Sequence, residues 1–466
     1  MSSLVPMEAV REALGGRDAW IVGGAVRDRL LGRDTVDLDV SLPGDPKDAA
    51  RRLARTTRGA AFRLSGDFGA WRVVGPGHAW HVDLVRLRDD DIHADLAARD
   101  FTINAMAEPL GGGKLLDPHG GRADLDARRL RMVGPDSLAA DPLRALRAVR
   151  LAVDLELSIE PATAEEIGRR APGLDRVAPE RVFGELKQVV CAPAVRTGLA
   201  LMETHGITAQ VLPELTALHG VDQTVFHHLD VYDHTLAVLD QVAAIERDPV
   251  AAGLGEHAAA VASRLRRTLA DELTRGEAMR FAALLHDAAK PWTRTELPGG
   301  RIGFPGHDRE GAELARRVLR RLRASQRLAN YVAALCLHHL RLGFLVHERP
   351  LDRRAVWRYL KATAPWSVEV TVFTVADRLA TRGRNAEPAI AAHLELARTM
   401  LGHALSDEAD RPPLVRGDDL ARELGVEPGP RLGDLLAQLE EDRFAGAIAT
   451  REDALRRARE LAADSR

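Results

Sequence analysis

The chain has 466 residues, of which 45% are hydrophobic and 29% charged, and its formal net charge is −3. This length predicts about two to four domains, and the composition is typical of a soluble globular protein. The charge neither indicates nor excludes a nucleic-acid binder, because local patches matter more than totals. The two cysteines predict no disulfide framework and suit a reducing cytoplasm. We find no apolar run of membrane-spanning length and no signal peptide, and therefore expect a cytoplasmic protein without a membrane partner.

Short β-like runs alternate with helical stretches over the first 90 residues. The runs cover residues 20–22, 36–40, 71–74 and 80–87. From about Asp141 onward apolar residues recur at three- and four-residue spacing, as in "PLRALRAVRLAV", which predicts an almost wholly helical remainder. The segment "SDEADRPPLV" (406–415) is charged and contains prolines, which indicates a linker.

The segment "WIVGGAVRDRLLGRDTVDLDV" (20–40) contains the first candidate site. Gly23 and Gly24 stand between a predicted strand and a predicted helix, where backbone N–H groups can approach a phosphate. Asp37 and Asp39 follow on the next strand, and side chains at i and i+2 share one face. Adjacent carboxylates repel unless a cation lies between them, and oxygen ligands suit Mg²⁺. The segment therefore indicates a phosphate cradle beside a Mg²⁺ site, with a tight turn and an exposed polar strand as the alternatives.

Four ordered motifs carry a family resemblance over residues 18–195. They are "GGAVRDRLLGR…DLD", "RDFTINAMA" (99–107), "LLDPHGGRADL" (115–125) and "DPLRALRAVR" (141–150). This series resembles the class II tRNA nucleotidyltransferase and bacterial poly(A) polymerase family. The resemblance implies a fold class: an α/β nucleotidyltransferase head of the DNA polymerase β type, followed by an all-helical neck, HD domain and tail.

The resemblance also implies roles for individual residues. Asp37 and Asp39 would bind the catalytic metals, and Asp83, in "WHVDLVRLR", would be a third catalytic carboxylate or else a surface residue at a strand end. Asp141 and Arg144 match the pair that reads the base edge, although an Asp before Pro142 is also a good helix N-cap. Arg144, Arg147 and Arg150 form a stripe that is alternatively a solvated face. The nucleotide-binding set expected is Gly23, Gly24, Arg27, Arg99, Asp100, Asn104, Asp141, Arg144, Arg147 and Arg150, with Arg99 and Asp100 on triphosphate and ribose and Asn104 bracing their loop.

Two positions depart from the family pattern. The family usually has an acidic residue where this chain has Ala140, and an Arg where it has Ala98. The first change removes an expected orienting partner of the base-reading pair, and the second removes a positive charge near the nucleotide. Both changes bear on nucleotide selection more than on catalysis, because the metal-binding carboxylates are intact.

A second group of motifs lies in the helical middle. "VYDHTLAV", "LLHDAAKP" and "VADRLATRG" place His234, His286-Asp287 and Asp377 in the order of the HD domain, a helical metal-dependent phosphohydrolase. The resemblance implies that these four residues bind one metal, and that His307 and His338 hold a second. Mixed imidazole and carboxylate ligands suit Mn, Fe, Ni or Zn better than Mg²⁺. Lys290 is a phosphate contact or a surface residue.

The motifs together predict a nucleotidyltransferase that adds CMP and AMP to the 3′ end of tRNA from CTP and ATP. Alternatives are poly(A), A-only or C-only addition by the same head, and an RNA-binding protein with an inactive head. The intact Asp37, Asp39 and Gly23 argue against the inactive head. The predicted division is 1–137 (head), 138–225 (neck and RNA-binding region), 226–405 (HD domain) and 406–466 (tail). The sequence does not predict the oligomeric state.

Overall fold

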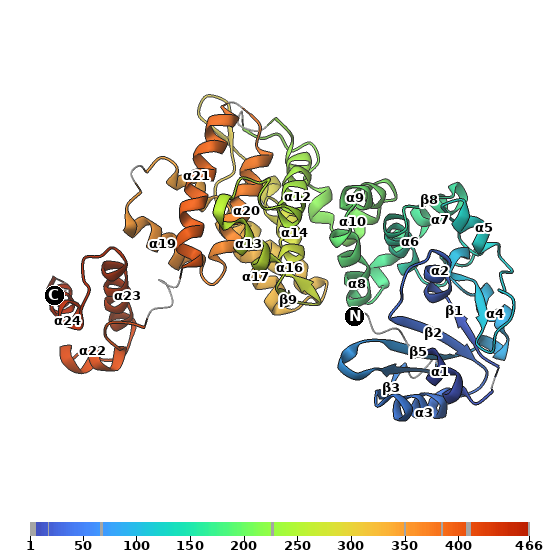
Figure 1. The fold of residues 1–466 in the computed structure, drawn as a ribbon. Coiled ribbons are helices and arrows are strands. Elements are labelled where there is room, and N and C mark those ends of the chain that lie inside the picture. The colour runs from blue at the N-terminus through green and yellow to red at the C-terminus, as the bar shows by residue number, and fades with distance from the viewer. Residues whose placement is uncertain are drawn as a thin grey trace. The chain divides into compact units, whose positions relative to one another are not determined.

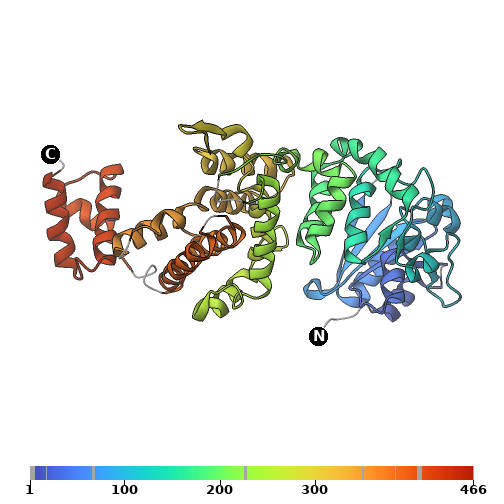
Figure 2. The same ribbon diagram turned by 90° about the horizontal axis from the view of Figure 1, so that it is seen from above.

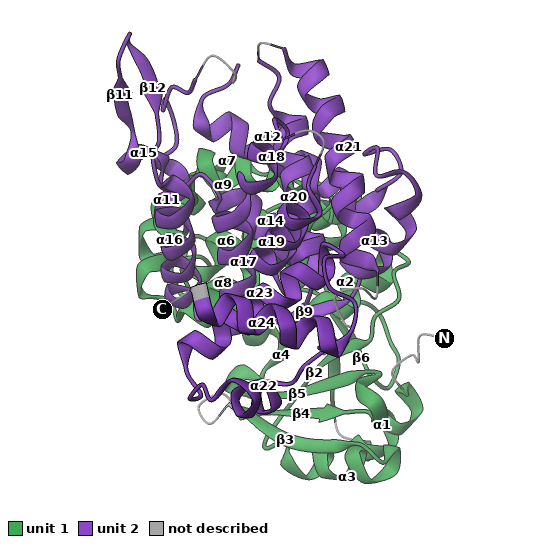
Figure 3. Ribbon diagram, turned by 90° about the vertical axis from the view of Figure 1, so that its left-hand side faces the viewer, with its two compact units in different colours: residues 1–211 green, residues 212–466 purple. Residues whose placement is uncertain are grey.

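The structure is a computed structural model that describes residues 6–16, 18–65, 69–224, 228–348, 351–383, 385–406 and 412–464. It forms two compact units, residues 1–211 and 212–466, which are coloured separately in Figure 3. The predicted neck–HD boundary falls within residues 225–227, and half of the predicted linker falls within residues 407–411; these residues lie outside the described ones.

The first unit begins with a mixed sheet whose strand order is β3-β4-β5-β2-β1-β6. Strands β2 and β5 are parallel and the other neighbours are antiparallel. The sequence predicted four of these strands and missed β3 and β6. The strands are β1 (Trp20–Val22), β2 (Asp37–Leu42), β3 (Ala60–Ser65), β4 (Ala70–Val74), β5 (His81–Arg86) and β6 (Ala107–Pro109), and a separate pair joins β7 (Arg129–Leu130) to β8 (Ser158–Ile159).

Alternation along β2 separates the core from the site. Leu38, Val40 and Leu42 are buried and pack in one hydrophobic cluster with residues of α1 and α3. The intervening Asp37 and Asp39 point to the opposite face, because successive strand side chains alternate. Figure 1 shows α1 and α3 together beside the sheet, in blue. The core therefore anchors the strand that carries the carboxylates.

Helices surround the sheet and complete the first unit. Helix α6 begins after Asp141-Pro142, and Asp141 Oδ1 accepts a hydrogen bond from the Leu143 N–H at 3.1 Å, which caps the helix start. The helices of this unit are α1 (Met7–Leu14), α2 (Gly24–Leu30), α3 (Lys47–Thr57), α4 (Ile92–Ala97), α5 (Gly121–Asp126), α6 (Leu143–Asp154), α7 (Pro161–Arg170), α8 (Pro179–Cys191), α9 (Val195–Thr204) and α10 (Ile207–Val211), with short turns η1 (Pro76–His78), η2 (Arg88–Asp90), η3 (Thr102–Asn104) and η4 (Ala171–Arg176).

The second unit is almost wholly helical, as the apolar spacing predicts. Helices α12, α14, α17 and α20 pack against one another to form its centre. The elements are α11 (Pro213–Thr216), α12 (Val231–Arg247), η5 (Gly255–His257), α13 (Ala258–Leu265), β9 (Thr268–Ala270), β10 (Leu273–Thr274), α14 (Arg275–Leu285), α15 (Lys290–Thr293), β11 (Thr295–Leu297), β12 (Arg301–Gly303), α16 (His307–Arg321), α17 (Gln326–His338), α18 (Arg341–Leu345), α19 (Arg353–Thr363), α20 (Ser367–Ala380) and α21 (Ala386–Leu405).

The last three helices have their own small core. Leu420, Leu435, Leu439 and Ala458 belong to one buried cluster drawn from all three helices. Figure 2 shows these helices as a red group at the end of the chain. They are α22 (Gly417–Leu424), α23 (Pro430–Phe444) and α24 (Arg451–Asp464).

One stretch of the described chain has the length and hydropathy of a membrane span. Residues Gln326–Leu345 have a mean hydropathy of 1.2, and 56% of that window is buried inside the protein. They form α17 and α18, and α17 packs against α14 and α16. Their apolar character is therefore explained by the core of the second unit.

Candidate active site

Three carboxylates lie on neighbouring positions of the head sheet. Asp39 of β2 is paired in register with Asp83 of β5, and Asp37 lies two residues before Asp39 on the same face. The Asp37 side chain is 61% exposed, and its Oδ1 lies 3.0 Å from His81 Nε2. Asp39 is partly buried. The carboxylate pair therefore lies on β2, the strand on which the sequence predicts it.

Asp83 is engaged by a neighbouring strand. Arg72 of β4 donates from Nε and Nη2 to the two Asp83 oxygens, each at 2.7 Å. This bidentate pair raises the pKa of Arg72. Arg72 thus holds Asp83 beside the Asp37–Asp39 pair, and the role of Asp83 as a third catalytic carboxylate stays a prediction.

The charge balance at Asp39 suits a cation. Burial raises the pKa of Asp39, the carboxylates of Asp83 and Asp37 raise it further, and Arg99 and Arg147 oppose them. The folded protein thus disfavours the charged form of Asp39 until more positive charge is supplied. Hard carboxylate oxygens beside a phosphate cradle are the donor set that Mg²⁺ prefers, so the residues present fit a bound divalent ion.

Gly23 shapes the turn above these carboxylates. It adopts φ 69° immediately before α2, a conformation that L side chains rarely adopt. A Cβ atom at this position would lie 2.8 Å from Arg99 Nη1 and 3.3 Å from Asp39 Oδ2. Because Gly23 has no side chain, the backbone can lie close to the Arg99 guanidinium and the Asp39 carboxylate.

We expect Gly23→Ala to lower nucleotide addition by about 10²-fold or more, since a displacement of about 1 Å at a reacting centre costs that much. The methyl group would push Arg99 away from Asp39 and strain the turn. Gly111→Ala is the control, because a Cβ there meets no atom within 4 Å and Gly111 does not line the cavity. The measurement is the single-turnover rate of each variant, with circular dichroism to show that both are equally folded. Equal rates would contradict this role of Gly23.

A chain of hydrogen bonds fixes the loop that bears Arg99 and Asp100. Arg27 Nη1 donates to Asn104 Oδ1 at 2.7 Å, and Asn104 Nδ2 donates to Asp100 Oδ1 at 3.1 Å. The other oxygen of Asp100 lies 2.9 Å from Arg147 Nε. Burial would raise the pKa of Asp100, but Arg147 and the hydrogen bond from Asn104 hold it below its ordinary value. Asp100 is therefore an ionised group that orients Arg147.

Asp141 and Arg144 stand at the start of α6. The Arg144 guanidinium donates to the carbonyl oxygens of Ser137 at 2.7 Å and Ala98 at 3.0 Å, which fixes its plane. Asp141 Oδ2 accepts a bond from Arg181 Nη2 at 2.5 Å. Sequence analysis missed Arg181, which lies on α8, 40 residues from Asp141 in the chain. The spacing of the two residues in the sequence does not indicate that contact. The alanine at position 140, where the family usually has an acidic residue, indicated only that an expected orienting partner is missing.

A cavity of about 240 Å³ brings most of the predicted residues together. Arg150 lies outside it, because its Nε pairs with Glu185 at 2.5 Å and its Nη1 lies 3.4 Å from Asp154. Arg27 also lies behind the lining, where it supports Asn104. The lining residues are Gly23, Gly24, Asp39, Arg99, Asp100, Asn104, Asp141, Leu143, Arg144, Arg147 and Arg181.

The second unit contains a buried cluster of imidazoles and carboxylates. His234 Nε2 lies 3.1 Å from Asp377 Oδ1, and His286 Nε2 lies 3.1 Å from Asp287 Oδ2. The ligand atoms form two groups, each within 4.8 Å: His234, His286 and Asp377 in one, and Asp287, His307 and His339 in the other.

His339, not His338, belongs to this cluster. The sequence singled out His338 as a ligand, but α17 ends there and its ring turns to Arg341. His339 is 3% exposed, and its Nε2 lies 3.3 Å from His307 Nε2. Two adjacent histidines point about 100° apart around a helix, so "HH" alone does not tell which of them faces the core.

The histidine tautomers favour metal binding at this cluster. The Nδ1 atoms of His286, His307 and His339 lie at 2.9, 2.7 and 2.5 Å from backbone carbonyl oxygens. Each Nδ1 must therefore carry a proton, so that in the neutral form of each ring Nε2 is the atom that can bind a metal. Among the described residues, Asp287 Oδ1 is buried without a hydrogen-bond partner. Converging lone pairs of this kind fit bound divalent cations.

Charge at Asp287 supports the same conclusion. Burial would raise the pKa of Asp287, but His286, Lys290 and His307 hold it well below its ordinary value. Lys290 Nζ lies 2.7 Å from Asp287 Oδ2 and donates to Gln223 Oε1 at 2.6 Å. Lys290 is 5% exposed, so the surface alternative for it is wrong. The cluster opens into a cavity of about 640 Å³ whose lining includes His307, Asp377 and the exposed Phe344.

Comparison with known families matches three successive segments. Residues 19–131 match the poly A polymerase head domain, residues 156–218 the probable RNA and SrmB-binding site of polymerase A, and residues 254–382 the HD domain. The head match includes the strand with Asp37 and Asp39, and the HD match includes the cluster residues except His234.

Relatives match nearly the whole chain. An A-adding tRNA nucleotidyltransferase of Deinococcus radiodurans is 37% identical over 443 residues, 94% of each chain. A CC-adding tRNA nucleotidyltransferase of Thermus thermophilus is 34% identical and covers 94% of this chain and 92% of its own length. Among solved structures, an apo CCA-adding enzyme superposes with a TM-score of 0.63 at 20% identity (97% and 92% covered), and the Thermotoga maritima CCA-adding enzyme with tRNA superposes at 0.59 and 20% (98% and 93%). The chain belongs to the tRNA nucleotidyltransferase family, with an HD domain after its helical middle.

Proposed function

We propose that the protein adds CMP and AMP to the 3′ end of tRNA from CTP and ATP in the cytoplasm, releasing pyrophosphate at each step. The observation that carries this proposal is the composition of the head cavity. One cavity of about 240 Å³ is lined by a carboxylate of the Asp pair, a glycine turn, two arginines for phosphate and the Asp141–Arg144 pair. A nucleoside triphosphate needs each of these contacts.

The chain's own residues divide the work as follows. Asp37 and Asp39 would hold Mg²⁺, which activates a 3′-hydroxyl and stabilises the leaving pyrophosphate when bound. Gly23 presents backbone at the phosphates, and Arg99 and Arg147 carry positive charge where the triphosphate gains negative charge. Asp100 holds Arg147 in place. The Arg144 fork, fixed by two carbonyls, presents donors to a base edge.

The test is an incubation of purified protein with tRNA that ends at the discriminator base. CTP alone, ATP alone and both together are supplied with Mg²⁺, and products are resolved at single-nucleotide length. Full CCA addition predicts two nucleotides from CTP alone and three from the mixture. The absence of extension under every condition would refute the proposal.

Partial addition is the second candidate. It is favoured by the contact of Asp141, because its second oxygen is held by Arg181 rather than left for a base. The names of the relatives, A-adding and CC-adding, point the same way. The same incubations with a second tRNA, one that already ends in CC, separate the cases: an enzyme that adds only C stops after two nucleotides in the mixture, and one that adds only A extends only the tRNA ending in CC.

We expect Arg181→Met to reduce discrimination among nucleotides about tenfold while lowering turnover less. The substitution frees Asp141 to rotate, and a misplaced contact to a base edge costs about 1–3 kcal/mol of discrimination. Arg144→Ala removes a reading group directly and should have the larger effect. Misincorporation of UTP and GTP measures both. Arg176→Met, a substitution of an exposed neighbour, is the control, and unchanged selectivity of Arg181→Met would exclude this positioning role.

We further propose that the HD cluster binds divalent transition metals and hydrolyses phosphate esters. Its ligands would be His234, His286 and Asp377 at one ion and Asp287, His307 and His339 at another. Imidazole-rich sets of this kind suit Mn, Fe, Ni or Zn. Lys290, held beside Asp287, would neutralise a bound phosphate. The substrates expected are phosphate ends or 2′,3′-cyclic phosphates of RNA.

A further inference from the structure

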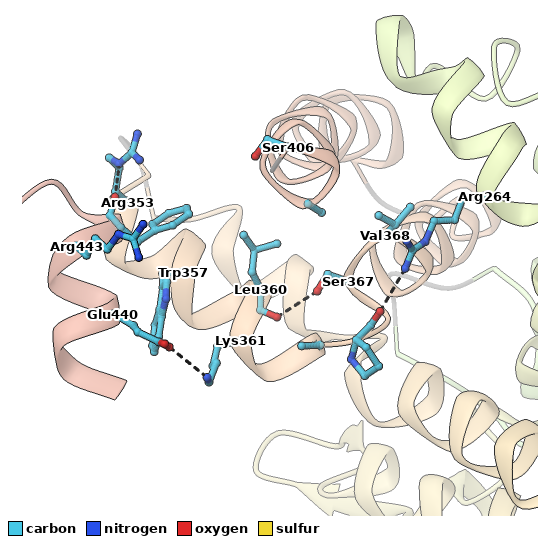
Figure 4. Close-up of a pocket in the computed structure, with 14 residues that line it drawn as sticks. Arg264, Arg353, Trp357, Leu360, Lys361, Ser367, Val368, Ser406, Glu440 and Arg443 are labelled. Carbon is cyan, nitrogen blue, oxygen red and sulfur yellow. Dashed lines mark hydrogen bonds and ion pairs between the residues drawn. The ribbon is translucent and has the colours of Figure 1, made fainter. Parts of the chain in front are cut away.

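A cavity outside both sites lies where α19 meets α20, α21 and α23 (Figure 4). Its volume is about 480 Å³, and it shares no lining residue with the HD cavity. One wall consists of Arg353, Trp357 and Lys361, which are four residues apart and so share a face of α19. Arg443 and other residues from the end of α23 form the opposite wall.

The cavity carries an excess of positive charge. Its lining contains Arg264, Arg353, Lys361 and Arg443 but only one carboxylate, Glu440. Arg264 is paired with the buried Glu369 at 3.0 Å. Lys361 Nζ lies 3.5 Å from Glu440 Oε2, and both side chains are about half exposed, 58% and 46%. An exposed pair of this kind is weak, so Lys361 can exchange Glu440 for a stronger anion.

Arg443 has donors to spare. Its Nη1 donates to the Pro412 carbonyl oxygen at 2.7 Å, and a carbonyl does not neutralise a guanidinium that has five N–H groups. The first turn of the 14-residue helix α20, at Ser367 and Val368, also lines the cavity. Helix N-termini favour anions, and here that feature adds to the arginine and lysine charge.

An aromatic ring lies beside these cations. Trp357 is partly buried, and Lys361 Nζ lies 5.8 Å from its ring centroid. Arg353, on the same face of α19, lies over the Phe444 ring at 5.0 Å. A flat ring next to mobile cations is the combination with which proteins bind single nucleotides: the base stacks and the phosphate pairs. The volume is also in the range of small-ligand pockets.

We propose that this cavity binds one nucleotide, with its phosphate at Arg443 and Lys361 and its base against Trp357. The inference goes beyond nucleotide addition, because none of these residues belongs to the head. The nucleotide could be part of an RNA chain, such as an unpaired position of the tRNA substrate, or a free mononucleotide. The two sources share the same chemistry and are distinguished by the experiment.

The first measurement compares tRNA affinity of the full-length protein and two variants as a function of salt. Lys361→Gln with Arg443→Gln should weaken binding about tenfold and lower the salt slope by about 0.7–0.9, the contribution of the one phosphate that the two cations share. Arg327→Gln, an exposed position on α17, is the matched control and should lower the slope less. Unchanged nucleotide addition at saturating tRNA shows that the double variant is folded.

The second measurement identifies the source of the nucleotide. Trp357→Phe keeps an aromatic ring in the wall. The difference in tryptophan fluorescence between the wild type and this variant reports on Trp357 alone. A change in that difference with tRNA but not with AMP or ATP assigns the cavity to RNA, whereas a change with AMP at unaltered tRNA affinity assigns it to free nucleotides. If neither ligand changes the difference and the double variant binds tRNA like the wild type, the proposal is wrong.

Discussion

Asp39→Asn and Asp37→Asn should each abolish nucleotide addition while the protein stays folded. Metal-assisted positioning and charge stabilisation supply most of phosphoryl-transfer catalysis, so we expect a loss of at least about 10³-fold. The two side chains share one face of β2, and Asp39 is in register with Asp83 of β5. The measurement is a single-turnover rate with Mg²⁺ in excess.

Stability provides the control for this prediction. The pKa of Asp39 is raised above its ordinary value of 3.8, so the folded state loses stability as pH rises through that value toward the raised pKa. At pH 7 without metal, Asp39→Asn should therefore melt at the same temperature as the wild type or higher. Asp48→Asn, on the exposed face of α3, should keep full activity. Near-normal addition by Asp39→Asn would remove these carboxylates from the mechanism.

The double variant His286→Ala with Asp287→Ala should lose bound transition metal and all phosphohydrolase activity, yet still add nucleotides with Mg²⁺. Both residues lie in the second unit, and none of the cluster's ligands lines the head cavity. Because the two sites favour different metals, a substitution in one site should abolish its own activity and leave the activity of the other site unchanged. Metal content by mass spectrometry and the two activities are measured side by side.

The neighbouring histidines offer a matched pair for the same question. His339→Ala removes a group whose Nε2 faces His307, whereas His338→Ala removes one that turns to Arg341. We expect metal loss from the first and none from the second. Equal metal content in both, or loss of nucleotide addition in a folded double variant, would contradict two independent sites. In the latter case the helical middle would instead be part of the tRNA-binding surface.

The sequence predicted that Asp37 and Asp39 share one face of a strand, because side chains at positions i and i+2 of a strand point to the same side. It also predicted four strands of the head sheet and the helical remainder, since apolar spacing distinguishes strands from helices locally. It could not predict Arg181, whose contact with Asp141 depends on how α8 packs against α6. Likewise, Arg150 continues the stripe of Arg144 and Arg147, but Glu185 on α8 draws it away from the cavity. Tertiary partners decided each of these cases.

The choice between His338 and His339 has the same origin. Both are on the last turn of one apolar helix, and only the position of α16 with His307 decides which ring enters the cluster. Strand β3 was missed because its residues 62–64 are exposed and mix polar with apolar groups, so no clean alternation marks it. The sequence motifs thus located each site, but tertiary packing determines which of the candidate residues belong to it.

The most direct test of the head's function is the stoichiometry of pyrophosphate release during extension of tRNA that lacks its 3′ end. Full-length protein, Mg²⁺, CTP and ATP are mixed with that tRNA, and released pyrophosphate is measured together with product length. CCA addition by the Asp37–Asp39 site predicts three pyrophosphates and three added nucleotides per tRNA, and neither product from Asp39→Asn. Extension by Asp39→Asn at the wild-type rate, or no pyrophosphate and no extension with the wild type, would contradict it.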